Sequence, residues 1–316
     1  MIANHDDAAS APLPIGAVRI DDPDDDRLEP YRDLKGGNGL RQRRGARDVI
    51  VEGRVAVTTL LGTGLTVHSV LLDDHQVALA TEVVDRAVAR RVPILVASRR
   101  VIAETVGFAL HRGVVAHAER PPVQALEDFL DLWAPGETAL VAEGVVDQEN
   151  LGALGRNAAA FGACALVLDP TSADPRNRRS VRVSAGHLLT LPLVRATPWP
   201  SALALLARSQ VRIAALVPPA STQRLRTERT CDLTPVVTVD ELAEAIGEPR
   251  HARAPGEHDL PRPRVALLVG SEGHGLSPSA LAYADVLVTI PIANGVDSVN
   301  LATAAAIALH HLALGR

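Results

Sequence analysis

The chain has 316 residues, a net charge of −5 and 47% hydrophobic residues, which is ordinary for a soluble globular protein of one or two domains. Aromatic residues make up only 2%, which excludes base stacking on aromatic platforms as a main theme. The longest nearly apolar run, residues 301–314, is too short for a membrane span, and two cysteines, Cys164 and Cys231, suggest neither a disulfide framework nor a cysteine-bound metal.

The N-terminus lacks the basic start and apolar segment of a signal peptide, so we expect the protein in the cytoplasm. Charge is distributed unevenly. Residues 1–30 carry eight acidic residues and two arginines, a local −6 that leaves about +1 for the rest of the chain. Basic residues gather in 31–56 and again in 174–182. Such patches could meet phosphates, although ordinary solvated surface would look the same.

The first part of the chain predicts an arm followed by a small domain. Residues 1–36 are rich in Pro and Asp and poor in branched apolar residues, which predicts a flexible acidic arm. The glycines of GGNG, residues 36–39, indicate a hinge. Residues 37–122 alternate between helix and strand patterns and predict a small α/β domain. A helix within residues 123–136 is expected to connect this domain to a second one.

Residues 137–316 predict a second α/β domain. Apolar strands such as TALVAEGV, VRIAALVP and RVALLVG alternate with helices, a pattern typical of a mostly parallel sheet. The Pro- and Arg-rich residues 218–263 contain one short helical stretch, VDELAEAIG. We expect them to form a surface insertion.

Three segments of this second domain carry candidate functional residues. In NLGALGRNAAAFG, residues 150–162, glycines allow close backbone approach near a helix start, and Arg156 could clamp a phosphate or perturb a hydroxyl. A capped helix with an exposed arginine would show the same pattern. In LLVGSEGHGLS, residues 267–277, a buried strand runs into a glycine-rich loop, where parallel sheets bind ligands. The loop lacks the Lys-Ser/Thr pair of a phosphate-binding P-loop.

The third segment, IPIANGVDSVN at residues 290–300, joins an apolar strand to an alanine-rich helix. Its Asp297, Ser298 and Asn300 could cap the first turn of that helix, or they could organise a ligand site. Two neighbouring strand ends thus carry small hydrogen-bonding residues, and this combination favours a binding site.

Together these segments resemble the three signature motifs of the SpoU (TrmH-type) RNA 2′-O-ribose methyltransferases, members of the SPOUT superfamily. The matching positions are Asn150, Gly152, Arg156, Phe161 and Gly162, then GSEGHGL, then Ile290, Pro291, Ile292, Ser298, Val299 and Asn300. Ile292 and Val299 replace the usual Met and Leu. Residues 44–122 resemble, less closely, the family's substrate-binding domain, which is similar to certain ribosomal proteins.

The resemblance implies a C-terminal domain with a deep trefoil knot, a homodimer and S-adenosylmethionine as cofactor. We expect no metal, because the cysteines suggest no metal site and His310 and His311 are expected at an interface or the surface. Carried over by position, the cofactor contacts fall on Gly270, Ile290 and Val299. The strand end near Leu216 could add to the pocket. The expected reaction is transfer of a methyl group to a ribose 2′-hydroxyl of structured RNA, ribosomal or transfer.

The resemblance also assigns the catalytic roles. Arg156 would stabilise the developing alkoxide, with Asn150 positioning that arginine or the ribose. The remaining motif polar residues, expected to organise loops and substrate, are Glu272, Ser298 and Asn300.

Phosphate contacts are expected from arginines of the basic patches and of the small domain. These are Arg41, Arg43, Arg44, Arg47, Arg112, Arg178 and Arg179. One alternative is a non-catalytic RNA-binding protein on the same scaffold, but the intact motif residues speak against it. Another is a hydrolase or dehydrogenase on a doubly wound fold, but the chain has neither a G-x-S-x-G elbow nor a dinucleotide fingerprint after an early strand.

Overall fold

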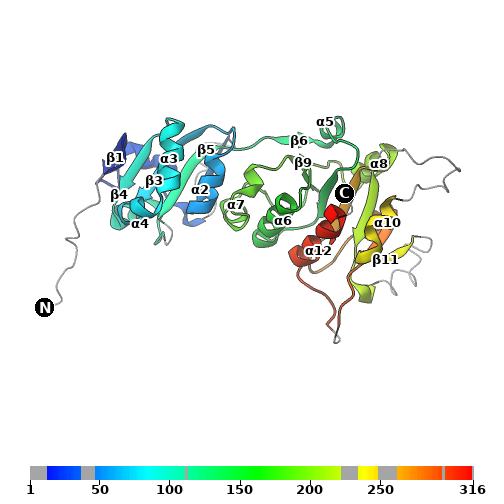
Figure 1. The fold of residues 1–316 in the computed structure, drawn as a ribbon. Helices are drawn as coiled ribbons and strands as arrows, with labels where there is room; N and C mark the ends of the chain where they lie inside the picture. Colours follow the sequence, from blue (N-terminus) through cyan, green and yellow to red (C-terminus); the bar gives the residue numbers. More distant parts are fainter. Residues whose placement is uncertain are drawn as a thin grey trace. The chain divides into compact units, whose positions relative to one another are not determined.

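The protein folds into two compact units, which we describe separately from a computed structural model (Figure 1). Unit 1 comprises Met1–Pro121 and Arg176–Thr190, and unit 2 comprises Pro122–Pro175 and Leu191–Arg316. The structure describes residues 13–36, 47–110, 113–221, 234–247, 262–293 and 296–314.

Unit 1 is built on a five-stranded sheet in the order β1-β4-β3-β5-β2. Its strands are β1 (Ala17–Ile20), β2 (Asp48–Glu52), β3 (Val67–Asp73), β4 (Ile94–Ala97) and β5 (Val114–Glu119). Strands β1, β3 and β4 run parallel, whereas β5 pairs antiparallel with both β2 and β3. The sheet is therefore mixed, and the predicted small α/β domain is confirmed in its fold class.

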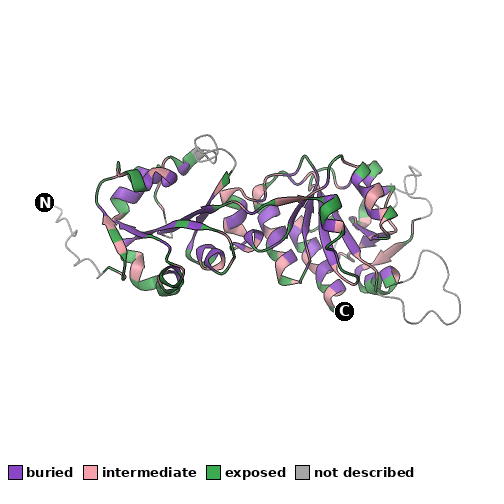
Figure 2. Ribbon diagram, turned by 90° about the horizontal axis from the view of Figure 1, so that it is seen from above, coloured by how far each residue is buried: buried purple, intermediate pink, exposed green. Residues whose placement is uncertain are grey.

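Helices cover both faces of this sheet, which is why β4 is buried along its whole length. One face packs against α2 (Arg54–Leu61), α3 (Thr81–Ala89) and α7 (Arg178–Val183). The other packs against α4 (Arg99–Val106) and the 3-10 helices η1 (Asp26–Tyr31) and η2 (Leu34–Gly36). Two further 3-10 helices are η4 (Asp74–Leu79) and η5 (His187–Leu189). In Figure 2 the inner strands are mostly buried, while the edge strand β1 is partly exposed and the helices expose their outer sides.

The flexible arm predicted for residues 1–36 is wrong for residues 13–36. Strand β1 pairs with β4, and Leu28 and Tyr31 are fully buried. The Tyr31 hydroxyl also donates to the carbonyl oxygen of Ser69 at 3.0 Å. Composition misled the prediction because a few large apolar side chains are enough to anchor a segment that is otherwise acidic. Residues 1–12 and most of the predicted hinge lie outside the described residues.

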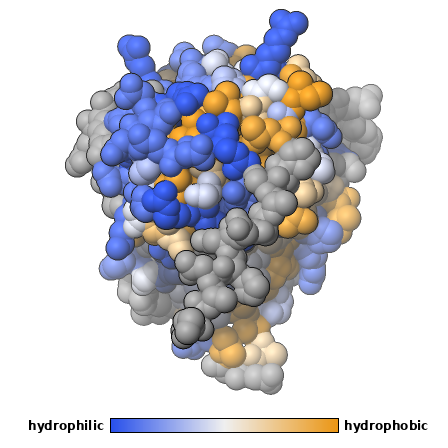
Figure 3. All heavy atoms as spheres, turned by 90° about the vertical axis from the view of Figure 1, so that its left-hand side faces the viewer, coloured by the Kyte–Doolittle hydropathy of each residue, from blue (hydrophilic) through white to orange (hydrophobic). Residues whose placement is uncertain are grey.

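Unit 1 also presents apolar side chains to solvent at the beginning of this segment. Ile15 is 88% exposed and Val18 on β1 is 42% exposed. The side of the molecule drawn in Figure 3 shows hydrophobic groups scattered among mostly hydrophilic ones. Apolar side chains exposed singly in this way are normal and indicate no particular partner.

Unit 2 contains an eight-stranded sheet in the order β11-β13-β10-β12-β7-β8-β9-β6, in which neighbouring strands are all parallel. The strands are β6 (Val123–Ala125), β7 (Thr138–Glu143), β8 (Leu166–Leu168), β9 (Leu193–Arg195), β10 (Arg212–Leu216), β11 (Val236–Thr238), β12 (Val265–Gly270) and β13 (Val286–Thr289). The predicted parallel sheet is confirmed.

Helices again bury both faces of this sheet. One core cluster joins the sheet to α5 (Leu126–Leu130), α8 (Ser201–Arg208) and α11 (Pro278–Leu281). The last helix, α12 (Leu301–Leu314), contacts β10 and β12 and packs beside α6 (Gln148–Ala160) and α10 (Leu242–Gly247). A 3-10 helix, η6 (Val239–Glu241), precedes α10. No helix in the described part of the chain is long and apolar enough to cross a membrane.

Three predicted domain boundaries need correction. Residues 123–136 are not only a connector, because β6 forms the edge of the sheet beside β9. Residues 218–263 are not only a surface insertion, because β11 pairs with β13 and α10 packs on α12. Residues 176–190 cluster with unit 1 rather than with the predicted 137–316 domain, because α7 packs against β2.

Candidate active site

The carboxyl ends of β10, β12 and β13, three neighbouring strands, open into a pocket of about 430 Å³. This is the edge at which parallel sheets bind their ligands. The lining includes Gly270, Ile290 and Val299, the three residues predicted to contact the cofactor, and Leu216 at the end of β10. The structure therefore brings these four residues together around one cavity.

The wall of the pocket combines apolar side chains with exposed backbone. Val217, Pro218 and Ile292 line it in addition to Leu216, Ile290 and Val299. The whole loop from Ser271 to Gly275 lines it too, and its three middle residues are solvent-exposed. Such a wall suits a ligand with a flat apolar part and several polar groups.

Steric crowding fixes the start of this loop. A Cβ atom added at Gly270 would lie 2.2 Å from the carbonyl carbon of Gly275, closer than any real contact. The loop closes on itself because the Gly275 amide donates to the Ser271 oxygen at 2.9 Å. Gly275 has φ +67°, a left-handed conformation that favours glycine. Two of the motif glycines are thus explained by the loop's own geometry.

Glu143, the last residue of β7, anchors the far end of the loop. Its carboxylate accepts from the amide of Ser277 at 2.8 Å and from the indole nitrogen of Trp199 at 2.6 Å. The Ser277 side chain in turn caps α11 by accepting from the amide of Ala280. The sequence analysis missed Glu143, whose only signal was an acidic residue at the end of an otherwise apolar strand.

Asn300 joins the three motifs. Its side-chain amide donates to Oδ1 of Asn150 at 3.0 Å and to Oε1 of Glu272 at 2.9 Å. Its own Oδ1 accepts from the amides of Ala302 and Thr303, so it also caps the start of α12. The structure confirms the capping interpretation for Asn300, and the organisation of a ligand site by this segment stays a prediction. Ser298, a neighbour in the same segment, lines the pocket together with Glu272 and Asn300.

Arg156 is exposed on α6 and has no hydrogen bond or ion pair with any residue that the structure describes. The next residue, Asn157, donates to the carbonyl oxygen of Ala302 at 2.8 Å and so ties α6 to α12. Asp147 caps the start of α6 by accepting from the amides of Glu149 and Asn150. Helix α6 is thus held at its N-terminus and at Asn157, while the guanidinium of Arg156 is available to a ligand.

Asp169, which follows β8, is a second residue that the sequence analysis missed. Burial alone would raise its pKa, but hydrogen bonds from the hydroxyls of Ser172 and Thr171 and from the amides of Gly144 and Thr171 outweigh burial and hold the pKa below its usual value. The Gly144 amide lies 3.0 Å from Oδ1. An ionised Asp169 therefore fixes the loop between β7 and α6.

The predicted RNA-contacting arginines fall into three groups. Arg47 and Arg179 are exposed. Arg178 donates to Glu52 at 3.0 Å and to the carbonyl oxygen of Leu34 at 3.0 Å, so its guanidinium is used within unit 1 and we remove it from the candidates. The remaining predicted residues, Arg41, Arg43, Arg44 and Arg112, lie outside the described residues.

Comparison with protein families gives two matches. A family model described as the SpoU rRNA Methylase family matches residues 137–310. A second, described as RNA 2′-O ribose methyltransferase substrate binding, matches residues 50–124. The two matches cover most of the chain that lies outside the N-terminal segment.

Individual relatives agree with these families. An uncharacterized tRNA/rRNA methyltransferase from Mycobacterium bovis is 38% identical over 293 residues, which cover 92% of this chain and 89% of the relative. The 23S rRNA (guanosine-2′-O-)-methyltransferase RlmB of Photobacterium profundum is 28% identical over 240 residues, covering 75% and 83%. A crystal structure of an AdoMet-bound rRNA methyltransferase from Sinorhizobium meliloti has a TM-score of 0.65 at 24% identity, covering 94% and 97%, and shows the fold.

Proposed function

Because the chain belongs to the SpoU rRNA methylase family, we propose that the pocket at the ends of β10, β12 and β13 holds S-adenosylmethionine for the methylation of ribosomal RNA. Membership in this family, with its matching substrate-binding domain, makes the chain an RNA 2′-O-ribose methyltransferase. The observation that carries the proposal is the hydrogen-bonded group of Asn150, Glu272 and Asn300, which joins all three motifs at the pocket rim.

The residues of the pocket fit this cofactor. A volume of about 430 Å³ lies within the range of small-molecule sites. Leu216, Ile290 and Val299 offer apolar surface for an adenine ring, and the Ser271 to Gly275 backbone offers polar groups. When bound, the cofactor supplies a methyl group already activated by a sulfonium. The protein must therefore only hold it and present the hydroxyl in line.

Arg156 is the residue that we assign to the hydroxyl. An arginine stays charged at any physiological pH, so it is a poor proton acceptor. Its positive charge favours a ribose oxygen that is losing its proton, and this stabilises the transition state. Asn150 lies six residues earlier, about 1.7 turns along α6, and is held by Asn300. We assign it the positioning of the ribose or of Arg156.

The substrate that we propose is structured RNA, ribosomal or transfer, as in the name of the Mycobacterium bovis relative. We put 23S ribosomal RNA first, because the RlmB relatives are named for it. Arg47 and Arg179 are exposed in unit 1 and offer charge to phosphates. We also propose that the protein acts in the cytoplasm, because ribosomal RNA is found there. We further propose the knot and the homodimer of the family. In support of a dimer, α12 is apolar apart from Thr303, His310 and His311, and Leu314 at its end is 70% exposed.

A methyl-transfer assay tests the proposal. Labelled S-adenosylmethionine is offered with unmodified ribosomal RNA and, separately, with unmodified transfer RNA, and the products are digested to nucleosides for mass spectrometry. We expect a 2′-O-methyl nucleoside from the ribosomal pool. No transfer to either RNA by a protein that binds the cofactor would overturn the assignment.

The role of Arg156 has its own test in the same assay. Arg156→Ala should reduce turnover by about 10² to 10³, the cost of removing one charge-stabilising donor, while cofactor affinity is unchanged. The matched control is Arg208→Ala, which removes another exposed arginine, at the end of α8. Loss of cofactor binding in Arg156→Ala would show that the residue builds the pocket instead.

A further inference from the structure

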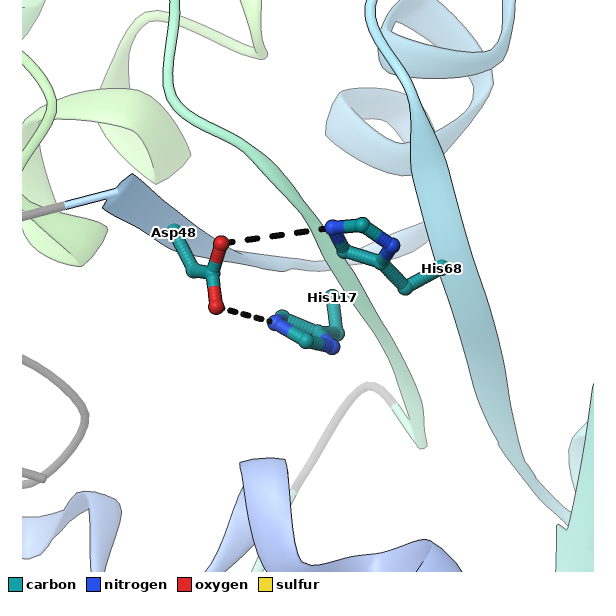
Figure 4. A group of neighbouring side chains, drawn as sticks. All are labelled: Asp48, His68 and His117. Atoms are coloured by element: carbon teal, nitrogen blue, oxygen red, sulfur yellow. Dashed lines mark ion pairs between the residues drawn. The ribbon is translucent and has the colours of Figure 1, made fainter. Parts of the chain in front are cut away.

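Unit 1 contains a cluster of two imidazoles and a carboxylate that the methyltransferase reaction does not use. Asp48, His68 and His117 come from β2, β3 and β5 and point toward one another (Figure 4). Nε2 of His117 lies 3.1 Å from Oδ2 of Asp48, and Nε2 of His68 lies 3.9 Å from Oδ1 of the same carboxylate. One ligand atom from each residue can be chosen so that all three lie within 4.8 Å of one another.

An irregularity in β3 creates this arrangement. Val67 pairs with Ala118, but the next registered pair is Ser69 with His117, so β3 advances two residues where β5 advances one. In a regular strand, His68 and Ser69 would point to opposite faces of the sheet. A β-bulge re-aims a side chain in this way, and bulges are features that folds retain for a reason. Here the bulge sends His68 to the side of His117 and Asp48.

We propose that Asp48, His68 and His117 bind one divalent transition-metal ion of the Zn²⁺ class, which ties β2, β3 and β5 together. Two imidazoles and one carboxylate are a donor set that Zn²⁺, Co²⁺ and Ni²⁺ accept, with further positions left for water. Two atoms that are each about 2.1 Å from one ion lie at most about 4.2 Å apart. The distances of 3.1 Å to Oδ2 and 3.9 Å to Oδ1 of the carboxylate satisfy this limit. The ligand atoms of the three residues lie within 4.8 Å of one another, so the exposed His68 would turn slightly to bring both imidazoles onto one ion.

The burial of the three side chains suits a metal site with access from solvent. The side chain of His117 is only 4% exposed and that of Asp48 only 15%, so a charge placed there is shielded from water. The side chain of His68 is 39% exposed, which provides the access route and the freedom to adjust to the ion. The rings of His68 and His117 are 4.6 Å apart and tilted by 41°, so they do not stack face to face.

A second cluster in unit 1, formed by Asp73, Asp74 and His75, is a weaker candidate. It offers a single imidazole. The carboxylate of Asp73 is already occupied, because it accepts from the guanidinium of Arg99 at 2.9 Å and from the amide of His75 at 2.9 Å. This cluster therefore supplies the matched control.

The test uses the full chain, stripped of metal with a chelator and titrated with Zn²⁺ by calorimetry near neutral pH, where imidazoles are mostly deprotonated. We expect one Zn²⁺ per chain and, with Co²⁺ in its place, visible absorption bands of a nitrogen- and oxygen-ligated ion. Loss of a residue that only hydrogen-bonds to a metal ligand lowers metal affinity roughly tenfold to a hundredfold. His68→Ala removes a ligand itself, so it should lower Zn²⁺ affinity by more than this. His75→Ala should leave the affinity unchanged.

Thermal melts without metal show whether a variant loses Zn²⁺ binding because it lacks a ligand or because it is unfolded. The exposed His68 can be replaced without opening the core, so His68→Ala without metal should melt like the metal-free wild-type chain. Added Zn²⁺ should raise the melting temperature of the wild-type chain and of His75→Ala, but not that of His68→Ala. The proposal is overturned if Zn²⁺ does not bind, or if binding survives undiminished in His68→Ala.

Discussion

The hydrogen-bonded residues at the pocket of unit 2 and the candidate metal cluster of unit 1 are built in opposite ways. Asn150, Glu272 and Asn300 lie in loops or at a helix start, beyond the ends of parallel strands. Asp48 and His117 lie within or at the end of paired antiparallel strands. Loop residues can carry polar side chains without disturbing the hydrogen bonds of a β-sheet. Several of them can therefore be neighbours in the sequence. Residues on different strands, in contrast, become neighbours only through the register in which the strands pair.

The pocket of unit 2 is therefore shaped mainly by backbone, and the cluster of unit 1 mainly by strand pairing and side-chain packing. In unit 2 the loop after β12 is shaped by glycines that leave no room for a side chain. In unit 1 the cluster depends on a bulge and on the packing beneath it, where Tyr31 fills the space next to Ser69. Substitutions in the loop after β12 should therefore mainly weaken ligand binding, whereas substitutions in the packing beneath the cluster of unit 1 should mainly weaken folding.

The largest expected effect is that of Tyr31→Ala. This side chain is fully buried, burial raises the pKa of its phenol so that it stays protonated, and its hydroxyl bonds to Ser69. Removing a large buried aromatic side chain costs about 3–5 kcal/mol of unfolding free energy. Urea unfolding of the full chain, followed by circular dichroism, measures the loss.

The control for Tyr31→Ala is Ile15→Ala in the same segment, since Ile15 is 88% exposed. It should change the unfolding free energy by less than about 0.5 kcal/mol. If both substitutions are harmless, residues 13–36 behave as the detached arm that composition suggested, and the contrast between the units disappears.

The elements of the fold were largely readable from the sequence. Apolar runs such as those of β7 and β12 predicted a parallel sheet, and the structure has one. The N-terminal segment was misjudged because average composition cannot show that Leu28 and Tyr31 find a cavity to fill. The edge strands β6 and β11 were missed because each has only three residues, too few for a periodic signal.

The two sites differ in the same way. Gly270, Ile290 and Val299 stand in contiguous motifs, so their resemblance to a family placed them at one pocket from the sequence alone. Asp48 and His117 are far apart in the sequence, and His68 reaches them only through a bulge. The expectation that no metal binds rested on the two cysteines and on His310 and His311 near the end of the chain, not on these three residues. No sequence pattern could have joined these three residues.

Gly270→Ala tests whether backbone shape alone determines the cofactor pocket. The added methyl would lie 2.2 Å from the carbonyl carbon of Gly275, so the loop must move. Overpacking of this kind costs about 1–3 kcal/mol, which corresponds to cofactor binding weakened roughly tenfold to a hundredfold. Calorimetric titration with S-adenosylmethionine measures the change. In the matched control, Gly273→Ala, the new methyl meets nothing within 4 Å and affinity should be retained.

Asp169→Asn tests the support beneath the first motif. The amide nitrogen of asparagine replaces one carboxylate oxygen, so a donor faces either the amide of Gly144 at the Oδ1 position or the amide of Thr171 at the Oδ2 position. This should cost about 1–3 kcal/mol near neutral pH. Because the pKa of Asp169 is lowered in the folded state, its contribution is present above the ordinary aspartate pKa of about 4 and is lost as pH falls through the lower folded value. The difference between variant and wild type, measured by urea unfolding, should therefore shrink in acid.

Exposed Asp131 provides the control for that measurement, since Asp131→Asn should change stability by less than about 0.5 kcal/mol at either pH. A deficit of Asp169→Asn that is independent of pH would mean that the residue acts through shape rather than through charge.

The smallest effect, and the most selective, is expected from Asn300→Asp. A carboxylate can still accept from the amides of Ala302 and Thr303, so the cap of α12 and the unfolding free energy should be preserved. It cannot donate to Asn150 or Glu272, and it places a second negative charge beside Glu272. Losing these hydrogen bonds should reduce methyl transfer roughly threefold to tenfold, at about 0.5–1.5 kcal/mol.

Asn300→Ala separates the two duties of this residue. It removes both the cap and the link between the motifs, so it should lose the same activity and, in addition, about 1 kcal/mol of stability. If Asn300→Asp keeps full activity, the link is incidental and Asn300 is only a helix cap. If it loses activity without losing stability, the hydrogen bonds at the pocket rim serve the reaction. The contrast between the two units then holds, because a loop residue of unit 2 could be changed without disturbing the fold.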